Sequence, residues 1–299
     1  MKPLIRTFII ALDGLDGIGK STFMDMLYSR FNMYINPNTV LIRQHFPVYE
    51  NKTGKMIKSF LFNGADLTNP VSVNQMIELQ IKNRSEWWCD LHNKIGSEYN
   101  DDGIVDVLIL ADRYMESNII YNAFGTNSNM MQQRASHIRD FELRHPQSPP
   151  TIQLFGYCDP KLQMERLLSR KELDRYETTE SVKILNDNFC SYIEWYRRHI
   201  PERTKYYCIP MHWYDDKYIM YKYIMNEYSE DDIHHAKVLR EVVLDFIVYM
   251  YAMMSDQKEL VKNLDMNSQG ACMVAYDLTR TYAAYSGIAK DIDDYTPFN

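Results

Sequence analysis

The chain has 299 residues, of which 45% are hydrophobic and 24% charged, and this is the composition of a globular protein with enough apolar material for a core. The formal net charge of −7 argues against a protein that coats nucleic acid, because such proteins need a basic surface. The five cysteines are scattered and odd in number, which supports neither a disulfide framework nor a zinc site. Because the sequence has no signal peptide and no apolar run of membrane-spanning length, we expect a cytoplasmic protein with no membrane partner.

The first predicted element is a buried strand over residues 7–12, which leads into a glycine loop and then a helix. The loop, residues 14–21, fits the pattern G-x-x-x-x-G-K-[ST] of phosphate-binding loops, and apolar residues recur at helical spacing over 23–31. Such a loop turns backbone N–H groups toward phosphate oxygens, and its lysine, here Lys20, reaches the β- and γ-phosphates. The alternative is a chance glycine-rich turn. The phosphate-binding positions are Gly14, Gly17, Gly19, Lys20, Ser21 and Thr22.

Strands and helices are predicted to alternate along the rest of the chain. Apolar runs predict strands over 39–45, 104–111, 151–158 and 205–209. Helical spacing predicts helices over 54–62, 71–98, 160–170, 179–199 and 231–254, with a further helix running through Tyr121. Residues 125–134 and 145–150 are predicted to be loops. This alternation predicts an α/β fold with a parallel five-stranded sheet and helices on both faces.

Ligands of such sheets bind beyond the carboxyl ends of the strands. Four segments lie at those ends and should converge: the glycine loop, Phe46-Pro47, Asp112-Arg113 and Asp159-Pro160. The chain is predicted to form one domain over residues 1–254. Residues 255–299 are less periodic and more polar, and we expect a C-terminal extension of unknown role.

Asp112 and Arg113 come directly after a buried strand. A carboxylate there can hold Mg²⁺ together with Ser21, and an arginine can bridge two phosphates with its planar guanidinium. The alternative is a surface ion pair at the end of a strand.

A basic cluster lies between two predicted helices. Its members are Arg166, Arg170, Lys171 and Arg175. One interpretation is a mobile lid whose arginines close over the transferring phosphates. The other is a solvated helix face, and the residues alone do not separate the two.

The chain resembles the thymidylate kinases from about residue 7 to residue 200, and more loosely to about residue 254. The glycine loop, the segment Phe46-Pro47-x-Tyr49 and the pair Asn83-Arg84 match family motifs. The segment Asp112-Arg113-Tyr114-x-x-Ser117-Asn118-x-x-Tyr121 matches the DR[YH] motif closely. Asp159-Pro160, the following arginines and Glu172-Leu173-Asp174-Arg175-Tyr176-Glu177 look like a bacterial-type lid, at about residues 168–180.

The resemblance implies a P-loop kinase fold with a lid and a role for each matching residue. Asp16 would bond the sugar 3′-hydroxyl, Tyr49 and Arg113 would hold the acceptor phosphate, and Tyr121 would crowd the sugar 2′ position. Arg84 and Asn118 would read the thymine edge. The full set implied for dTMP is Asp16, Phe46, Tyr49, Gln80, Arg84, Arg113, Ser117, Asn118, Tyr121 and Tyr176.

Gly17 stands where one branch of the family carries a basic residue in its glycine loop. The lid must then supply the missing positive charge, because Lys20 and Mg²⁺ leave part of the phosphoryl charge uncompensated. The predicted catalytic residues are Lys20, Arg113, Arg170 and Arg175, with Ser21 and Asp112 as the metal site.

The expected activity is that of a nucleoside monophosphate kinase. With Mg²⁺ as cofactor, the γ-phosphoryl group of ATP would be transferred directly and in line to dTMP, which gives dTDP for DNA precursor synthesis. The resemblance also implies a homodimer. Gln80 replaces the phenylalanine that usually stacks on thymine, which leaves open a kinase for another or a modified deoxynucleotide, or for a deoxynucleoside. A further alternative, of a different class, is a non-catalytic nucleotide-binding assembly protein.

Overall fold

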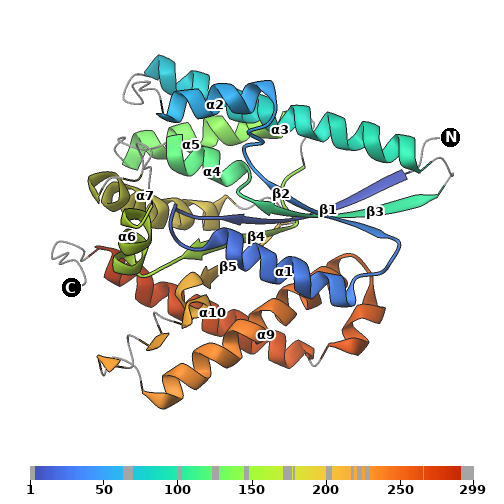
Figure 1. The fold of residues 1–299 in the computed structure, drawn as a ribbon, viewed down its shortest axis with the longest axis vertical. Coiled ribbons are helices and arrows are strands. Elements are labelled where there is room, and N and C mark those ends of the chain that lie inside the picture. Colours follow the sequence, from blue (N-terminus) through green and yellow to red (C-terminus); the bar gives the residue numbers. More distant parts are fainter. Residues whose placement is uncertain are drawn as a thin grey trace.

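Five parallel strands form one sheet at the centre of the computed structural model (Figure 1). The strands are β1 (Leu4–Asp13), β2 (Thr39–His45), β3 (Ile104–Asp112), β4 (Ile152–Tyr157) and β5 (Lys205–Pro210), in the order β2-β3-β1-β4-β5. The structure describes residues 4–62, 70–99, 103–122, 128–144, 148–170, 177, 179–199, 204–216, 219–220, 224–225, 229–264 and 266–290. The predicted α/β architecture with a parallel five-stranded sheet is confirmed.

Helices cover both faces of the sheet (Figure 1). Those drawn above it are α2 (Lys52–Phe62), α3 (Pro70–Glu98), α4 (Met115–Asn122) and α5 (Ser128–Leu143). Those drawn below it are α1 (Lys20–Tyr34), α9 (Glu230–Met254) and α10 (Ser268–Lys290). The remaining elements are α6 (Pro160–Leu168), α7 (Thr179–Arg198) and the 3₁₀ turns η1 (Met211–Tyr214) and η2 (Lys258–Asn263). In the part of the chain that is described, no helix has the length and apolar character to cross a membrane.

Strands β1, β3 and β4 are buried on both faces along much of their length, which explains why they read as largely apolar runs. Along β1, Ile10 and Leu12 belong to the core on one face, whereas Ile9 and Ala11 belong to the core on the other. Strand β3 alternates in the same way. A parallel sheet covered by helices on both sides requires this pattern.

The structure differs from the sequence prediction in two helices. Helix α5 begins at Ser128, so the loop predicted over 125–134 is wrong for its described residues, 128–134. Residues 132–134 of this helix are polar, and Ala135 and Ile138 further along are buried. Helix α10 lies inside the predicted C-terminal extension and packs against β5, which is an edge strand of the sheet.

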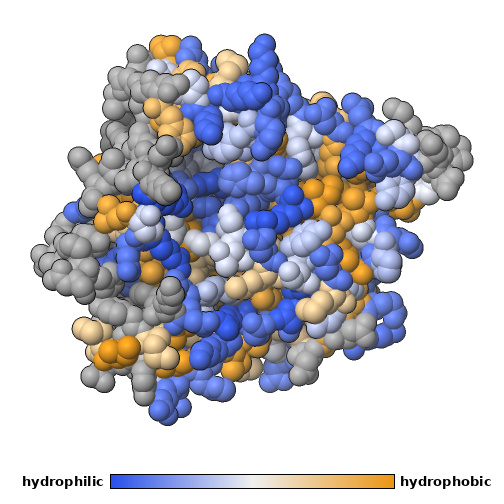
Figure 2. All heavy atoms as spheres, in the orientation of Figure 1, coloured by the Kyte–Doolittle hydropathy of each residue, from blue (hydrophilic) through white to orange (hydrophobic). Residues whose placement is uncertain are grey.

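The register of the sheet brings the predicted site segments to one edge. Leu12 of β1 and His45 of β2 both pair with Asp112 of β3, so the glycine loop starts beside the ends of two neighbouring strands. Figure 2 shows hydrophilic residues gathered across this face of the molecule just above α1. The convergence predicted from the strand ends therefore holds for the glycine loop, Phe46-Pro47 and Asp112-Arg113.

Candidate active site

The glycine loop between β1 and α1 depends on two residues with left-handed backbone. Gly17 has φ of 80° and Gly19 has φ of 96°, a region that residues with a Cβ rarely adopt. Gly19 is the N-cap of α1, so the free amides of the first helical turn open at the loop. Gly14 lies deeper, because a Cβ there would come within 2.5 Å of the carbonyl oxygen of Gly156.

Lys20 is buried at the base of this loop. Its Nζ donates to the carbonyl oxygen of Leu15 at 2.6 Å. Burial, together with the nearby Arg113 guanidinium, lowers the pKa of Lys20 to about 8, although Asp16 and Asp112 favour the charged form. The amine is therefore mostly charged at pH 7, but it loses its proton as the pH rises through about 8.

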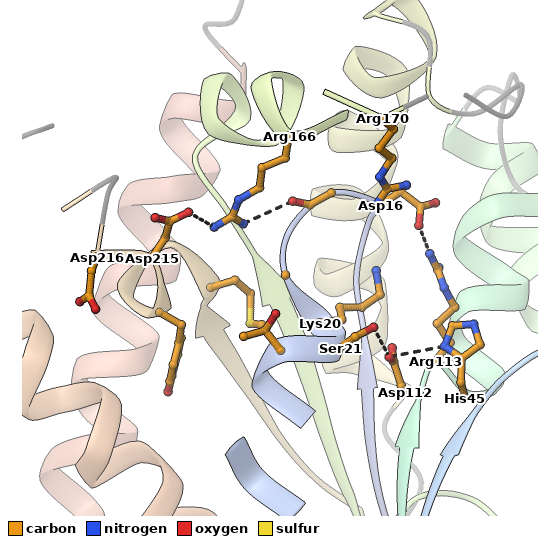
Figure 3. A pocket seen from close by; sticks show the side chains of 15 residues that line it. Asp16, Lys20, Ser21, His45, Asp112, Arg113, Arg166, Arg170, Asp215 and Asp216 are labelled. Atoms are coloured by element: carbon orange, nitrogen blue, oxygen red, sulfur yellow. Dashed lines mark hydrogen bonds and ion pairs between the residues drawn. The ribbon is translucent and has the colours of Figure 1, made fainter. Parts of the chain in front are cut away.

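Ser21, Asp112 and His45 form a polar group beside Lys20 (Figure 3). The Ser21 hydroxyl donates to Oδ2 of Asp112 at 2.7 Å, and Nδ1 of His45 lies 3.4 Å from the same oxygen. Burial raises the pKa of Asp112, but His45 and Lys20 outweigh burial and hold that pKa below its usual range, so the carboxylate is ionised.

The second oxygen of Asp112 makes this group a candidate magnesium site. Oδ1 of Asp112 is buried and has no hydrogen-bond partner among the described residues. An unpaired carboxylate oxygen beside a serine hydroxyl fits Mg²⁺, which proteins often hold with one or two ligands while phosphates and water supply the others. Among the described residues, no group of three or more His, Cys, Asp or Glu side chains could hold a metal.

Asp16 and Arg113 form an ion pair at the centre of the site (Figure 3). The other oxygen of Asp16 accepts a hydrogen bond from Tyr121 at 2.7 Å, and the Arg113 guanidinium lies 5.1 Å from the Tyr121 ring centroid. Burial raises the pKa of Asp16, but Arg113 and Lys20 lower it by more, so the carboxylate is ionised. Arg113 has φ of 67°, an uncommon value for a residue with a side chain, and such strain concentrates at functional sites.

Two cavities meet at this ion pair. One, of about 710 Å³, extends over the glycine loop, and the other, of about 350 Å³, lies between α2, α3 and α4. The residues that line both are Asp16, His45, Arg113 and Arg170. We call them the loop cavity and the inner cavity. The two cavities therefore adjoin end to end, with charged groups at their junction.

Most of the residues predicted to contact dTMP line the inner cavity. They are Asp16, Phe46, Tyr49, Gln80, Arg84, Arg113, Ser117 and Tyr121. Asn118 does not line it: this side chain is fully buried, with its amide nitrogen bonded to Glu142 at 2.8 Å and its oxygen to Asn122 at 2.7 Å. Tyr176, like Arg175, lies outside the described residues.

Glu142 of α5 links the two residues that resemblance assigns to reading the base. One of its oxygens accepts from both Arg84 and Asn118, and both Arg84 and Glu142 are buried. Nε of Arg84 is buried and has no hydrogen-bond partner in the described part of the chain, and the Arg84 side chain lines the inner cavity. Sequence reasoning missed Glu142, because its role depends on helix packing rather than on a motif.

Asn83, next to Arg84, fixes the segment after β2. Its side chain accepts from the backbone N–H of Val48 at 2.7 Å and donates to the carbonyl oxygen of Val48 at 3.0 Å. The same amide donates to Asn51 and Thr53, so Phe46 and Tyr49 are held at the cavity wall. In the sequence, the family motif Asn83-Arg84 was the feature that could have pointed to this role of Asn83.

Asp13, the residue before Gly14, is a second missed residue. One oxygen of this fully buried carboxylate accepts from the backbone N–H groups of Tyr114 and Ser117, each at 2.9 Å, and from the Ser117 hydroxyl. The other oxygen accepts from Gln153 at 3.1 Å. Asp13 therefore ties the end of β1 to the start of α4, and Ser117 serves this contact as well as lining the inner cavity.

The predicted lid residues fall into two groups. Arg170 lines both cavities and forms an ion pair with Glu177, and Figure 3 shows its side chain above Asp16. Arg175 lies outside the described residues. Arg166, which the sequence placed in the basic cluster and the lid-like segment without a role of its own, contacts the glycine loop directly.

The family model described as thymidylate kinase matches residues 12–204, which is more than half of the chain. A solved thymidylate kinase from Candida albicans is similar at 20% identity, over 74% of this chain and 92% of that chain, with a TM-score of 0.47. No curated protein sequence matches this chain.

Proposed function

Because the chain belongs to the thymidylate kinase family, whose members are nucleoside monophosphate kinases, we propose that it transfers the γ-phosphoryl group of ATP to dTMP, with Mg²⁺, for DNA precursor synthesis. The observation that carries this proposal is the junction of two cavities at Asp16, Arg113 and Arg170. The loop cavity would take ATP and the inner cavity would take dTMP. The two reacting phosphates would then meet among the charged groups that both cavities share.

On the donor side, this chain's residues bind and orient the phosphates. The first amides of α1 and the Lys20 amine would contact the β- and γ-phosphates, so the bond from Lys20 to Leu15 would be exchanged for one to phosphate. Ser21 and Asp112 would hold Mg²⁺, which supplies charge neutralisation between the β- and γ-phosphates. Gly14, Gly17, Gly19 and Thr22 complete the proposed ATP-binding set.

On the acceptor side, Arg113 is fixed before the substrate arrives. Its ion pair with Asp16 and the neighbouring Tyr121 ring hold the guanidinium at the junction of the cavities, where it would bind the dTMP phosphate. That phosphate is already ionised and nucleophilic, so transfer needs no general base, and the residues act by positioning and charge compensation. Arg170, and Arg175 and Tyr176 in a lid at about 168–180, are proposed to close the site.

Gln80 favours a second candidate, a kinase for another or a modified deoxynucleotide or for a deoxynucleoside. Its side chain lines the inner cavity with Arg84, and an amide offers hydrogen bonds but no aromatic face to a base. For this second candidate, the acceptor would carry a base with an extra polar substituent that hydrogen-bonds to the Gln80 amide.

A screen of acceptors tests the proposal. Purified protein would receive ATP and Mg²⁺ with dTMP, dUMP, a 5-hydroxymethyl pyrimidine deoxynucleotide, dCMP, dGMP or thymidine, and the nucleoside diphosphates formed would be quantified. We expect dTMP to have the highest kcat/KM, and Lys20→Ala to abolish transfer while the circular dichroism spectrum is kept. Turnover of thymidine without turnover of any monophosphate would contradict the proposal. ATP binding without turnover of any acceptor would instead support a non-catalytic assembly protein.

We also propose a homodimer in which each subunit has one kinase domain, residues 1–254, followed by the extension 255–299. Resemblance to the family supports the dimer. Analytical ultracentrifugation over a range of concentrations would measure the molar mass, and a monomer at the concentrations used for the kinase assay would contradict it.

A further inference from the structure

Arg166 of α6 joins the glycine loop to the segment that follows β5 (Figure 3). Its Nη1 donates to the carbonyl oxygens of Ile18, at 2.9 Å, and Gly17, at 3.3 Å. Its Nη2 donates to Oδ2 of Asp215. Both side chains of this ion pair are largely buried, with exposed fractions of 25% for Arg166 and 22% for Asp215.

Asp215 is carried by a well-anchored turn. Its backbone N–H donates to the carbonyl oxygen of His212 at 3.2 Å, which closes η1. Within η1, Trp213 is buried and Tyr214 packs edge-on against Phe23 of α1, with ring centroids 5.0 Å apart. The Asp215 carboxylate is therefore a fixed acceptor on the wall of the loop cavity rather than a mobile surface group.

The neighbouring ion pair ties this turn to the C-terminal helices. Oδ1 of Asp216 lies 2.8 Å from Nη1 of Arg240 on α9, and the Tyr214 hydroxyl donates to the carbonyl oxygen of Arg240 at 3.3 Å. Polar contacts thus link α9 to residues 214–216, and Asp215 links this segment through Arg166 to the glycine loop. Every residue of η1 and α9 lies beyond residue 204, where the match to the family model ends.

The effect of Arg166 on the glycine loop follows from its binding to carbonyl oxygens of the loop and not to N–H groups. A phosphate is bound by the loop's N–H groups, so a guanidinium that holds the carbonyl oxygens of Gly17 and Ile18 fixes the orientation of these peptide groups beforehand. The contact is close, because a Cβ at Gly19 would lie 3.3 Å from Nη1 of Arg166. An arginine without a carboxylate partner would be free to leave the carbonyls for the more strongly negative phosphates.

We propose that Asp215 is a positioning residue for the phosphate donor: it holds Arg166 against the carbonyls of the glycine loop and so preorganises that loop for ATP. This inference rests on the proposed function, because it assumes that ATP binds in the loop cavity. It assigns part of the donor site to a segment of the chain that the family match does not cover.

The test measures the dissociation constant of a non-hydrolysable ATP analogue with Mg²⁺, together with kcat and both KM values. Asp215→Asn should weaken analogue binding and raise the KM for ATP by about tenfold, since the lost contact is a hydrogen bond between charged groups. The kcat at saturating ATP and the KM for dTMP should change by less than about twofold. Asp215→Glu, which keeps the charge, should restore most of the affinity.

A double-mutant cycle checks that Asp215 acts through Arg166. Arg166→Lys keeps the positive charge but cannot bridge the loop and Asp215 at once, so it should weaken analogue binding by itself. Adding Asp215→Asn to Arg166→Lys should then change the dissociation constant by less than twofold. Additive effects of the two substitutions would overturn the proposal.

The matched control is Asp106→Asn. Asp106 pairs with Arg6 at 2.6 Å with 18% of its side chain exposed, but it lies near the opposite end of β3, and its loss should leave analogue binding unchanged. Tighter binding by Asp215→Asn would mean that this carboxylate only repels phosphate, and unchanged binding would mean that it only stabilises the fold. Either result would overturn the inference. Absence of transfer by the wild type would refute the proposed kinase activity, but the binding measurements would still decide the role of Asp215.

Discussion

Lys20 makes donor binding sensitive to pH. Burial lowers its pKa to about 8, and only the charged amine can pair with phosphate, so ATP binding must take up a proton from solvent whenever Lys20 is neutral. We expect the affinity for a non-hydrolysable ATP analogue to be constant between pH 7 and 7.5. It should then fall as pH rises through 8, approaching a tenfold loss per pH unit. Titration calorimetry from pH 7 to 9.5 would measure this.

The control for the Lys20 prediction is Lys20→Arg. A guanidinium stays charged over the whole range, so this variant should show a flat profile even if its affinity is lower. A flat profile in the wild type would contradict the assignment of Lys20 as the cation that binds the donor phosphates.

Gln80 allows a second prediction at the residue scale. Gln80→Phe would present an aromatic face to the inner cavity, and stacking of a base on such a face contributes about 1–3 kcal/mol. We expect the KM for dTMP to fall by roughly tenfold and the preference for dTMP over other deoxynucleotides to increase. The measurement is kcat/KM across the acceptor panel. Gln80→Leu, which adds apolar surface without a π face, should leave the preference unchanged, and an equal effect of both variants would argue against stacking.

Sequence reasoning predicted those residues of the loop cavity that local motifs mark. Lys20, Ser21 and Asp112 each follow a strand end in a recognisable pattern, and the structure brings all three together. Glu142 and Asp215 carry no such mark, because each becomes part of the site only when its helix or turn packs beside an arginine from another part of the chain. Asn118 is the opposite case: a motif marks it, but the motif does not show that its side-chain amide is bonded to Glu142 instead of lining the inner cavity.

At the scale of elements, the strands were the most predictable part of the fold. The strand predicted over 39–45 has the observed bounds of β2, an edge strand in which the apolar residues 40–42 precede the polar residues Arg43, Gln44 and His45. Helix α5 was missed at its start, where Gln132, Gln133 and Arg134 are polar and its packing against α4 and α7 determines the structure. Helix α10 was missed although Ala271, Val274 and Leu278 recur at helical spacing.

The junction of β1 and α4 gives a prediction at this scale. Asp13→Ala would leave the backbone N–H groups of Tyr114 and Ser117 without their buried acceptor, which should lower the free energy of unfolding by about 3 kcal/mol. Asp13→Asn keeps one acceptor oxygen for these groups. Its new amide can donate to Oε1 of Gln153 after that side chain turns over, and this oxygen has no partner among the described residues.

We therefore expect Asp13→Asn to lower the free energy of unfolding by about 1 kcal/mol or less. Urea denaturation of both variants and the wild type would measure the difference. If Asn were as damaging as Ala, the negative charge of Asp13 would matter more than its hydrogen bonds to α4.

At the scale of the whole molecule, the C-terminal third is continuous with the kinase core. Helix α10 packs against β5, α7 and α9, and α9 packs against α1, the helix that starts at the glycine loop. An edge strand with unpaired backbone groups invites pairing with other chains, and a covering helix is one way to prevent it. Residues 255–290 thus include a structural layer of the fold, and we expect them to contribute to stability rather than to catalysis.

Leu278 tests this expectation in the full-length chain. Its side chain on α10 is 1% exposed and belongs to the same core as β1 and β5. Leu278→Ala should lower the free energy of unfolding by about 2–5 kcal/mol, the range for a leucine removed from a packed core, while the KM values for ATP and dTMP stay within about twofold of the wild type. Tyr276→Ala is the matched control on the same helix, since Tyr276 is 68% exposed and its loss should change stability by no more than about 0.5 kcal/mol. Urea denaturation followed by fluorescence would measure both.

If Leu278→Ala left the main transition in place and added a separate early one, α10 would unfold independently of the kinase core. Residues 255–299 would then be an appended unit rather than a layer of the fold.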